Sequence, residues 1–114
     1  MNNLNEEQQL ICKKYSASYE KCDLELKIGV SLSVKNGERP IHGLRIRAEN
    51  GTSGWYIWAG EWSNEPDFFV PLHGVHLHDW APIVLPYLGL PNGWRFLVSE
   101  DYEDVWQDLG ILEN

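Results

Sequence analysis

Cysteine and basic residues are scarce in this sequence, and long apolar runs are missing altogether. The two cysteines, Cys12 and Cys22, have no second pair to complete a zinc site and form no C-x-x-C redox motif. We therefore expect free thiols, the usual state in a reducing compartment, although a disulfide stays open if the segment between them turns back. No apolar run approaches the roughly 18 residues that a membrane-spanning helix needs, so the sequence predicts no membrane partner.

Signatures of catalysis are missing as well. The chain has no G-x-S-x-G elbow, no P-loop, no G-x-G-x-x-G turn and no recognisable pairing of a cysteine with a histidine. Neighbouring carboxylates such as Glu61 with Asp67, or Glu103 with Asp104, are expected by chance among seventeen acidic residues. Acid–base catalysis would also need environments that separate their pKa values. The sequence therefore predicts no catalytic residue and no enzymatic activity.

Three histidines form the one cluster that resembles a metal site. His73, His76 and His78 lie close together in the sequence, beside Asp79. On a helix His73 and His76 share a face while His78 points elsewhere, and on a strand His76 and His78 align without His73. No H-E-x-x-H signature is present to place two ligands and a general base on one helix. We predict no metal and no cofactor, and a His-based metal-dependent enzyme stays the less favoured alternative.

The composition indicates one folded domain. Of the 114 residues, 43% are hydrophobic and 12% aromatic, which supplies more apolar area than disordered chains carry. Area scaling implies that a chain of this length buries about two-thirds of its surface, enough to fold without disulfides or metal. The polar start, Met1 to Glu7, does not resemble a secretory signal. We expect a single domain over residues 1–114, located in the cytoplasm.

The acidic residues are concentrated toward the carboxyl end. Nine Lys and Arg against seventeen Asp and Glu give a net charge of −8, which argues against nucleic acid or an anionic membrane and favours a basic partner. Residues 61–114 contain ten acids and one base, Arg95, which we expect to pair with a carboxylate of the same chain. The acidity indicates either a solvated surface or an electrostatic docking face. Six acids lie within fourteen residues: Glu100, Asp101, Glu103, Asp104, Asp108 and Glu113.

Apolar periodicity predicts a helix and then a β-hairpin in the first half of the chain. Residues 5 to about 15 have acids early and lysines late, which suits the helix dipole. Apolar and polar residues alternate without a break over residues 24–34, the pattern of a strand with one buried face. Asn36-Gly37 supplies a tight turn, so we expect a returning strand over residues 44–48 to pair with the first.

The second half predicts further strands around a helical segment. Bulky side chains on both faces of residues 55–59 indicate a central strand, and residues 61–74 predict a long ordered loop. Helical spacing over residues 76–88 is broken by two prolines, and two more strands are expected over residues 94–98 and 102–106. Together these elements predict an α+β fold: a single domain with an N-terminal helix packed on a mostly antiparallel β-sheet of four to six strands, and a short kinked helical segment before the last strands.

Trp62 and Trp106 are the tryptophans in the most polar surroundings. Core packing is the commoner fate of tryptophan. Trp62, however, lies within the polar segment 61–65, and Trp106 is flanked by Asp104 and Asp108. An exposed aromatic anchor within an acidic surface is typical of a protein interface. It suits a small-molecule or carbohydrate-binding module too, and this alternative stays open.

Several blocks of sequence carry a family resemblance. They include Ile11-Cys12-Lys13-Lys14-Tyr15, Glu49-Asn50-Gly51-Thr52-Ser53-Gly54-Trp55-Tyr56-Ile57-Trp58, Asp67-Phe68-Phe69, Pro71-Leu72-His73 and Gly93-Trp94-Arg95-Phe96-Leu97. On these blocks, residues 12–112 resemble the bacterial immunity-protein-thirty-three-like family of polymorphic toxin systems. The resemblance implies a small cytoplasmic protein that protects its producer by binding a toxin, and it carries over no catalytic residue. Where the family has Pro-Gly before its aromatic-Arg-Phe block, this chain has Asn92-Gly93, which also suits a turn.

We therefore predict a cytoplasmic immunity protein that neutralises a bacterial toxin by stoichiometric inhibition. The predicted partner is a cognate toxin with a basic face, and neither nucleic acid nor a membrane. A homodimer stays open, because small sheets with free edges pair readily. Carboxylates are expected to steer the toxin and tryptophans to anchor it. The predicted partner-binding residues are Trp62, Asp101, Glu103, Asp104, Trp106 and Asp108.

Overall fold

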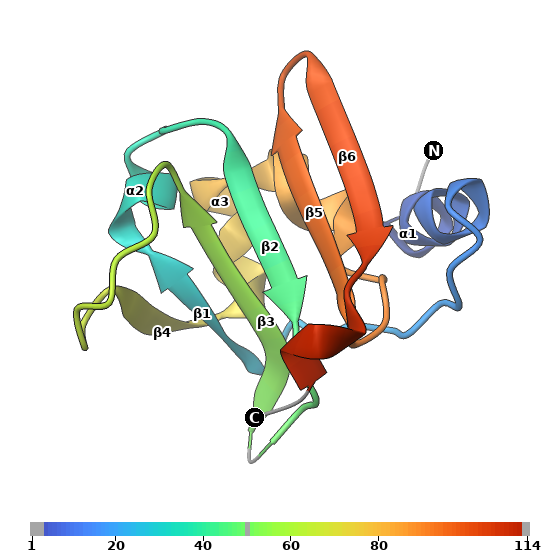
Figure 1. Ribbon diagram of the computed structural model, residues 1–114, viewed down its shortest axis with the longest axis horizontal. Helices are drawn as coiled ribbons and strands as arrows, with labels where there is room; N and C mark the ends of the chain where they lie inside the picture. The colour runs from blue at the N-terminus through green and yellow to red at the C-terminus, as the bar shows by residue number, and fades with distance from the viewer. Residues whose placement is uncertain (1–3, 50, 113–114) are drawn as a thin grey trace.

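A six-stranded sheet, covered by helices on one face, organises the protein (Figure 1). The computed structural model describes residues 4–49 and 51–112. The strand order is β4-β1-β3-β2-β5-β6; β1 runs parallel to β3, and all other neighbours are antiparallel. This arrangement confirms the predicted α+β fold with its mostly antiparallel sheet. The strands are β1 (Lys27–Ser31), β2 (Ile41–Arg45), β3 (Thr52–Ala59), β4 (Phe69–His73), β5 (Trp94–Ser99) and β6 (Tyr102–Gln107).

The helices are short apart from the first. The predicted N-terminal helix is confirmed as α1 (Leu4–Lys14), and the kinked segment before the last strands is confirmed as a series of short turns. Pro82 begins the last of these turns and Pro86 lies inside it, which explains why no continuous helix forms. None of the described helices is long and apolar enough to cross a membrane. The remaining helical elements are α2 (Leu32–Lys35), η1 (Gly74–His76), α3 (Leu77–Trp80), η2 (Pro82–Tyr87) and η3 (Leu109–Leu112).

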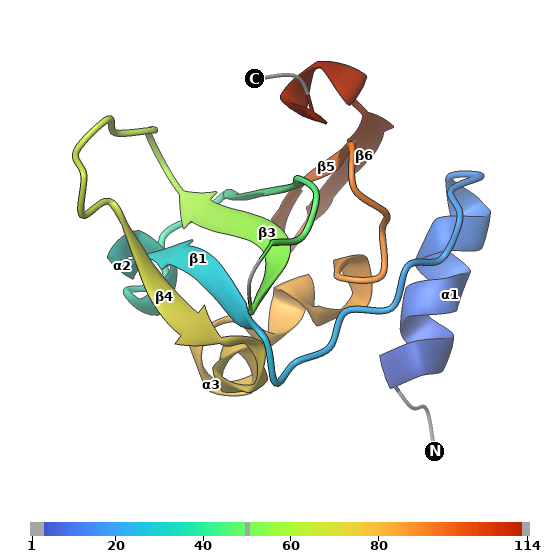
Figure 2. The ribbon, with the colours of Figure 1, turned by 90° about the horizontal axis from the view of Figure 1, so that it is seen from below.

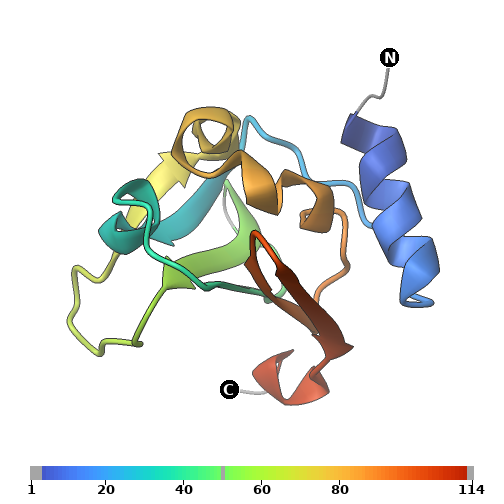
Figure 3. The ribbon, with the colours of Figure 1, turned by 90° about the horizontal axis from the view of Figure 1, so that it is seen from above.

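The core lies between the sheet and the segment formed by α3 and η2 (Figure 3). Strand residues alternate between the two faces of a sheet, and Trp55, Ile57 and Phe96 are fully buried against the helices. Gly43 on β2 is required where the Phe96 ring crosses the strand, because a Cβ there would lie 2.2 Å from that ring. Burial of these large side chains supplies the main stabilisation of the fold.

The predicted hairpin between residues 24–34 and 44–48 is wrong, although the chain does reverse. The first strand is shorter than expected, because β1 ends at Ser31 and α2 begins at Leu32. The hydroxyl of Ser33 donates to the carbonyl of Ala59 at 2.9 Å, which stabilises the bend. Strand β3 then lies between β1 and β2 and pairs with both. Alternation predicted correctly that Ile28 and Val30 are buried, whereas Leu32, which was expected on the same face, begins α2 and is 55% exposed. The pattern also contains no information about which strand pairs with which.

The predicted loop over residues 61–74 is also only partly right. Residues 60–68 form a loop, but Phe69–His73 form strand β4, which pairs with β1 at the edge of the sheet. Pro71 hid this strand from sequence analysis. A proline has no N–H to donate, and it is therefore tolerated on an edge strand such as β4.

Helix α1 reaches the rest of the protein mainly through η2. Its inward side chains are polar or small as well as apolar. The side-chain amide of Gln8 donates to the carbonyl of Leu85 at 3.0 Å, and the thiol of Cys12 contacts the carbonyl of Gly89 at 3.3 Å. Gly89 allows this close approach, since a Cβ would lie 2.9 Å from Gln8. Cys12 and Cys22 are both buried free thiols, and burial raises their pKa values.

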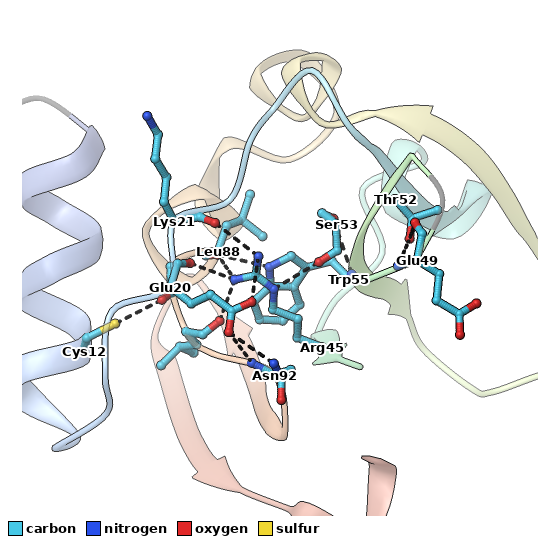
Figure 4. A network of polar contacts seen from close by, with 12 residues as sticks. Cys12, Glu20, Lys21, Arg45, Glu49, Thr52, Ser53, Trp55, Leu88 and Asn92 are labelled. Atoms are coloured by element: carbon cyan, nitrogen blue, oxygen red, sulfur yellow. Dashed lines mark hydrogen bonds and ion pairs between the residues drawn. The ribbon is translucent and has the colours of Figure 1, made fainter. Parts of the chain in front are cut away.

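Arg45, at the end of β2, is the centre of a buried polar network (Figure 4). Only 3% of its surface is exposed. The guanidinium forms an ion pair with Glu20 at 3.4 Å, and lies 5.7 Å from the centre of the Trp55 ring. Glu20 in turn accepts from the backbone and side chain of Asn92. Five backbone carbonyls accept hydrogen bonds from the guanidinium: those of Glu20, Lys21, Ser53, Leu88 and Leu90.

Candidate partner-binding surface

Among the described residues, no α-helix packs across the face of the sheet away from α3 and η2 (Figures 1 and 2). We call it the open face. It is flanked on one side by residues 60–68, the flanking loop, and on the other by η3 (Figure 2). Side chains alternate between the two faces along each strand, so the residues next to those that point into the core point to the open face. The open face presents His42, Leu44, Tyr56, Trp58, Phe69, Arg95, Leu97, Asp104 and Trp106.

Six rings form an aromatic cluster on this face. His42 and Trp58, directly opposite each other on β2 and β3, are stacked with ring centres 4.9 Å apart. Trp62 meets Trp58 and Phe69 in edge-to-face geometry, with ring centres 5.0 and 5.4 Å apart. Such edge-to-face pairs each contribute about 0.5–1.5 kcal/mol beyond the area that they bury. The cluster therefore holds the flanking loop against the sheet; its members are His42, Tyr56, Trp58, Trp62, Phe68 and Phe69.

The flanking loop is ordered by its own hydrogen bonds and leaves Trp62 accessible. Trp62 is 53% exposed, and its indole N–H donates to the side-chain oxygen of Asn64 at 2.9 Å. The loop also contains Glu61, Glu65 and Asp67, which are all exposed. None of the ion pairs within residues 4–49 and 51–112 involves these three carboxylates. The accessible indole thus shares its loop with three exposed carboxylates that form no ion pair within the described part of the chain.

A groove of about 490 Å³ lies between the flanking loop and η3. Its floor is formed by Leu44 of β2 and Tyr56 of β3, which face each other across the sheet. Trp62 and Phe69 form one wall and Ile111 of η3 the other. This volume falls within the range of side-chain and small-ligand pockets. The open face is therefore hollowed as well as apolar.

Strand β6 places a second tryptophan on the same face. Trp106 lies opposite Arg95, whose guanidinium is 5.5 Å from the centre of the indole. Arg95 also forms an ion pair with Asp108 at 3.2 Å, which confirms the expectation that it pairs internally. Asp104, two residues before Trp106 on β6, points to the same face and is exposed. Strand β2 lies between β3, which carries Tyr56 and Trp58 of the aromatic cluster, and this pair of residues on β5 and β6.

The carboxyl-terminal acids do not form one patch. Asp101 lies in the turn between β5 and β6, in contact with the Ser99 hydroxyl. Glu100 pairs with Arg39 at 3.0 Å, and Asp108 pairs with Arg95. Glu113 lies outside the described residues. Three of the six predicted partner-binding residues, Trp62, Asp104 and Trp106, share the open face, whereas Glu103 points to its opposite side.

Glu103 holds α1 to the sheet. Its carboxylate accepts from Tyr87 of η2 at 2.5 Å, from Tyr15 after α1, and from Lys14, whose nitrogen is 2.7 Å away. Burial of this carboxylate opposes its ionisation, but the hydrogen bonds from Lys14, Tyr15 and Tyr87 outweigh that effect and lower the pKa of Glu103. Burial first, and the bond to Glu103 second, raise the pKa of Tyr87 well above its ordinary value. The network favours ionised Glu103 with neutral tyrosines.

Replacing Glu103 with glutamine is expected to lower the free energy of unfolding at pH 7 by about 1–2 kcal/mol, because an ionised acceptor is lost from three hydrogen bonds. The folded pKa of Glu103 lies below its unfolded value, so this stabilisation is complete above the unfolded pKa and is lost as the pH falls through the folded one. Urea titrations from pH 7 to pH 3 should therefore show a smaller loss of stability for Glu103→Gln than for the wild type.

Glu100→Gln is the matched control for that measurement. Its partner is also a cation on another element, but the Glu100 side chain is 70% exposed against 25% for Glu103. Exposed pairs contribute little, and we expect a change within about 0.5 kcal/mol. Equal effects of the two substitutions would contradict the role assigned to Glu103.

The histidine cluster of the sequence is spread over three elements. His73 ends β4, His76 lies in η1 and His78 in α3, and all three are exposed. Among the described residues, no three His, Cys, Asp or Glu side chains lie close enough together to hold a metal ion. His42, which the sequence analysis did not single out, is stacked in the aromatic cluster, and burial lowers its pKa.

Sequence reasoning missed most of the open face. Tyr56, Trp58 and Phe69 carry its aromatic character, yet each occurs in a stretch that also contributes to the core. One signal was present: the run of residues 55–59 has bulky side chains on both faces, which indicates that both faces of that strand are covered or in contact with something. The unpaired acids of the flanking loop were visible only as possible chance pairs.

Comparison with known proteins identifies a family. The model of the Imm33-like domain matches residues 7–108. That range includes all six strands, the flanking loop and the helices up to η2, apart from the first three residues of α1. A search of curated proteins and a search of solved structures each returned no match.

Proposed function

The chain belongs to the Imm33-like domain family, and on that premise we propose that it is an immunity protein that holds a bacterial toxin inactive in a stoichiometric complex through its open face. Membership of this family implies neutralisation of a toxin. Binding alone is sufficient for inhibition if the immunity protein covers the toxin's active site or blocks a movement that the toxin needs. No catalytic step by the immunity protein is required.

One observation carries the choice of surface: the open face bears the aromatic cluster, and Trp62 of that cluster is exposed. Monomeric proteins rarely leave contiguous apolar patches uncovered unless they bind something. Large exposed aromatic side chains are enriched among the residues that dominate binding energies. Trp62 and Trp106 are the two anchors in this proposal, one at the flanking loop and one on β6.

Negative charge around the anchors supports a basic toxin surface. Asp104 is exposed on the same face of β6 as Trp106, Asp101 is exposed in the turn between β5 and β6, and Trp62 shares its loop with three exposed acids. Such charges mainly increase the rate of association, because they attract the partner before contact. Asp108 contributes by fixing Arg95 beneath Trp106, and Glu103 by fixing α1, so we assign neither of these two to direct contact.

The test uses the toxin domain encoded beside this gene. Isothermal titration with the wild-type protein should give a one-to-one complex, and the toxin should lose its activity at that ratio. Asp104→Lys is expected to weaken binding by about 3- to 10-fold at low salt, mainly through a slower association rate, and by less at high salt.

Glu25→Lys is the control for the charge reversal. Glu25 is exposed in the segment before β1, which is not part of the open face, and it forms none of the ion pairs of the described chain. Its reversal changes the net charge equally and should leave the association rate nearly as it was. Equal slowing by both variants would show that net charge rather than the open face controls association, and a wild-type protein that leaves the toxin active would overturn the function.

A further inference from the structure

The groove between the flanking loop and η3 has a composition that specifies part of its occupant. This inference is based on the proposed function and extends it to the chemistry of the toxin segment. None of the apolar residues that line the groove belongs to the buried core cluster. They are therefore available for contact with a partner. They come from five separate parts of the chain and are Leu44, Ile46, Tyr56, Trp62, Phe69 and Ile111.

The shape of the groove favours a protruding apolar side chain. A flat aromatic surface would suit a planar ligand, but the rings that line the groove meet at steep angles: Phe69 is inclined by 63° to Trp62 and by 75° to Tyr56. Walls at such angles enclose a group that enters between them. Burying a large aliphatic or aromatic side chain there contributes about 1.5–3 kcal/mol through removal of apolar area from water.

The charge around the groove is asymmetric. On the loop side, Glu65 lines the groove, Glu61 and Asp67 are its neighbours in the loop, and none of the three forms an ion pair within the described residues. On the η3 side, the exposed base Arg47 donates to the carbonyl of Leu112 at 3.0 Å. A segment seated in the groove is therefore attracted through any base that it places toward the loop.

We propose that this groove receives a bulky apolar side chain from a basic segment of the toxin, with the Lys or Arg residues of that segment lying against Glu61, Glu65 and Asp67. The apolar side chain supplies the buried contact, and the bases supply the orientation. An acidic or uncharged segment with the same apolar side chain is disfavoured, because it leaves the three carboxylates without a counter-charge. The groove thus selects its partner by two features together.

Short peptides test the groove directly on the full chain. The probe is acetyl-Lys-Lys-Phe-Lys-Lys-amide, and its two controls replace either the Phe with Gly or all four Lys with Glu. Binding is followed by NMR through the indole N–H signal of Trp62, assigned with the Trp62→Phe variant. We expect the Phe-containing basic peptide to bind at least about tenfold more tightly than both controls. Equal binding of the Gly peptide, equal binding of the acidic peptide, or no shift of the Trp62 signal would each overturn the proposal.

Two variants locate the binding. Ile111→Lys places a charge in the wall of the groove and should abolish the shift, whereas Leu10→Lys, an equal change at a 66% exposed residue on α1, should not. Ile111 lies in a short terminal turn outside the core. Should Ile111→Lys nevertheless lose its native circular dichroism spectrum, Glu65→Lys replaces it, and a preference for the basic over the acidic peptide that survives this reversal would overturn the proposal.

The toxin separates this inference from the function on which it is based. If the toxin binds Ile111→Lys as tightly as it binds the wild type, the groove proposal fails and the immunity function stands. If the toxin fails to bind the wild type while the basic Phe peptide still binds in the groove, the function fails and the groove's preference stands. Displacement of the basic Phe peptide by a neutral oligosaccharide at equal concentration would overturn the protein-segment proposal in favour of a sugar.

Discussion

Replacing Arg45 with alanine is expected to reduce the free energy of unfolding by about 3–5 kcal/mol, the largest loss that we predict for any single substitution away from the apolar core. Arg45 is 3% exposed and donates to five backbone carbonyls. These carbonyls belong to the segment after α1, to β3 and to the segment after η2, so the guanidinium links β2 to two segments outside the sheet. Alanine removes this donor from all five. The carbonyl of Leu88 keeps the indole N–H of Trp55 at 3.0 Å, and each buried carbonyl left unsatisfied costs about 1–3 kcal/mol unless water enters.

Lysine at this position should recover only part of the loss. Its ammonium group has three donors at one point, whereas the guanidinium has five donors in a plane and can contact several carbonyls at once. Arg47→Ala is the matched control, since Arg47 is an exposed arginine two residues further on that bonds one carbonyl. Chemical denaturation followed by tryptophan fluorescence measures all three variants. A loss below about 1 kcal/mol for Arg45→Ala would show that the network is replaced by water at little cost.

Replacing Trp62 with alanine is expected to weaken toxin binding by about 2–4 kcal/mol, which corresponds to a factor of roughly 30 to 1,000 in the dissociation constant. Trp62 is 53% exposed in the free protein and contacts Trp58, Phe68 and Phe69. A partner seated on the open face completes the burial of the indole. The dissociation rate should rise more than the association rate falls, because the lost contact is apolar and short-ranged.

The control for Trp62 is Leu10→Ala, a truncation of an exposed apolar side chain on α1, away from the open face. It should leave the affinity unchanged. Thermal unfolding of the free Trp62→Ala protein should show a modest decrease in stability, since the aromatic cluster lies outside the main core. A toxin that binds Trp62→Ala and wild type equally would place the interface elsewhere on the molecule.

Elements defined by local pattern were predictable from the sequence. The first helix, the central strand β3, the proline-broken helical segment and the last two strands all have a clear periodicity or a clear break in it. Pairing between strands was not predictable. Asn36-Gly37 is followed by a reversal of the chain, as expected, but β3 enters between the two segments that the turn connects. This strand order depends on the long-range hydrogen bonds of the sheet, and the residues of the turn do not indicate it.

The candidate site was predictable in part for a similar reason. Polar neighbours in the loop correctly indicated that Trp62 is exposed, because a loop residue among acids has little access to the core. Whether one of these carboxylates forms an ion pair depends on a cation that is distant in sequence. The pairs are Lys14 with Glu103, Arg39 with Glu100 and Arg95 with Asp108. Net charge and its distribution along the chain therefore predicted an acidic protein but not where the unpaired acids lie.

Because helices cover only one face of the sheet, each strand contains two sets of residues that are under different packing constraints. Side chains that point toward α3 and η2 must fit one another, and an exchange at any of them disturbs the whole interior. Side chains at every second position between them touch only their neighbours on the surface and whatever docks there. If the toxin docks on the open face as proposed, substitutions at alternate positions of β2, β3, β5 and β6 change what the protein recognises, while the residues between them keep it folded.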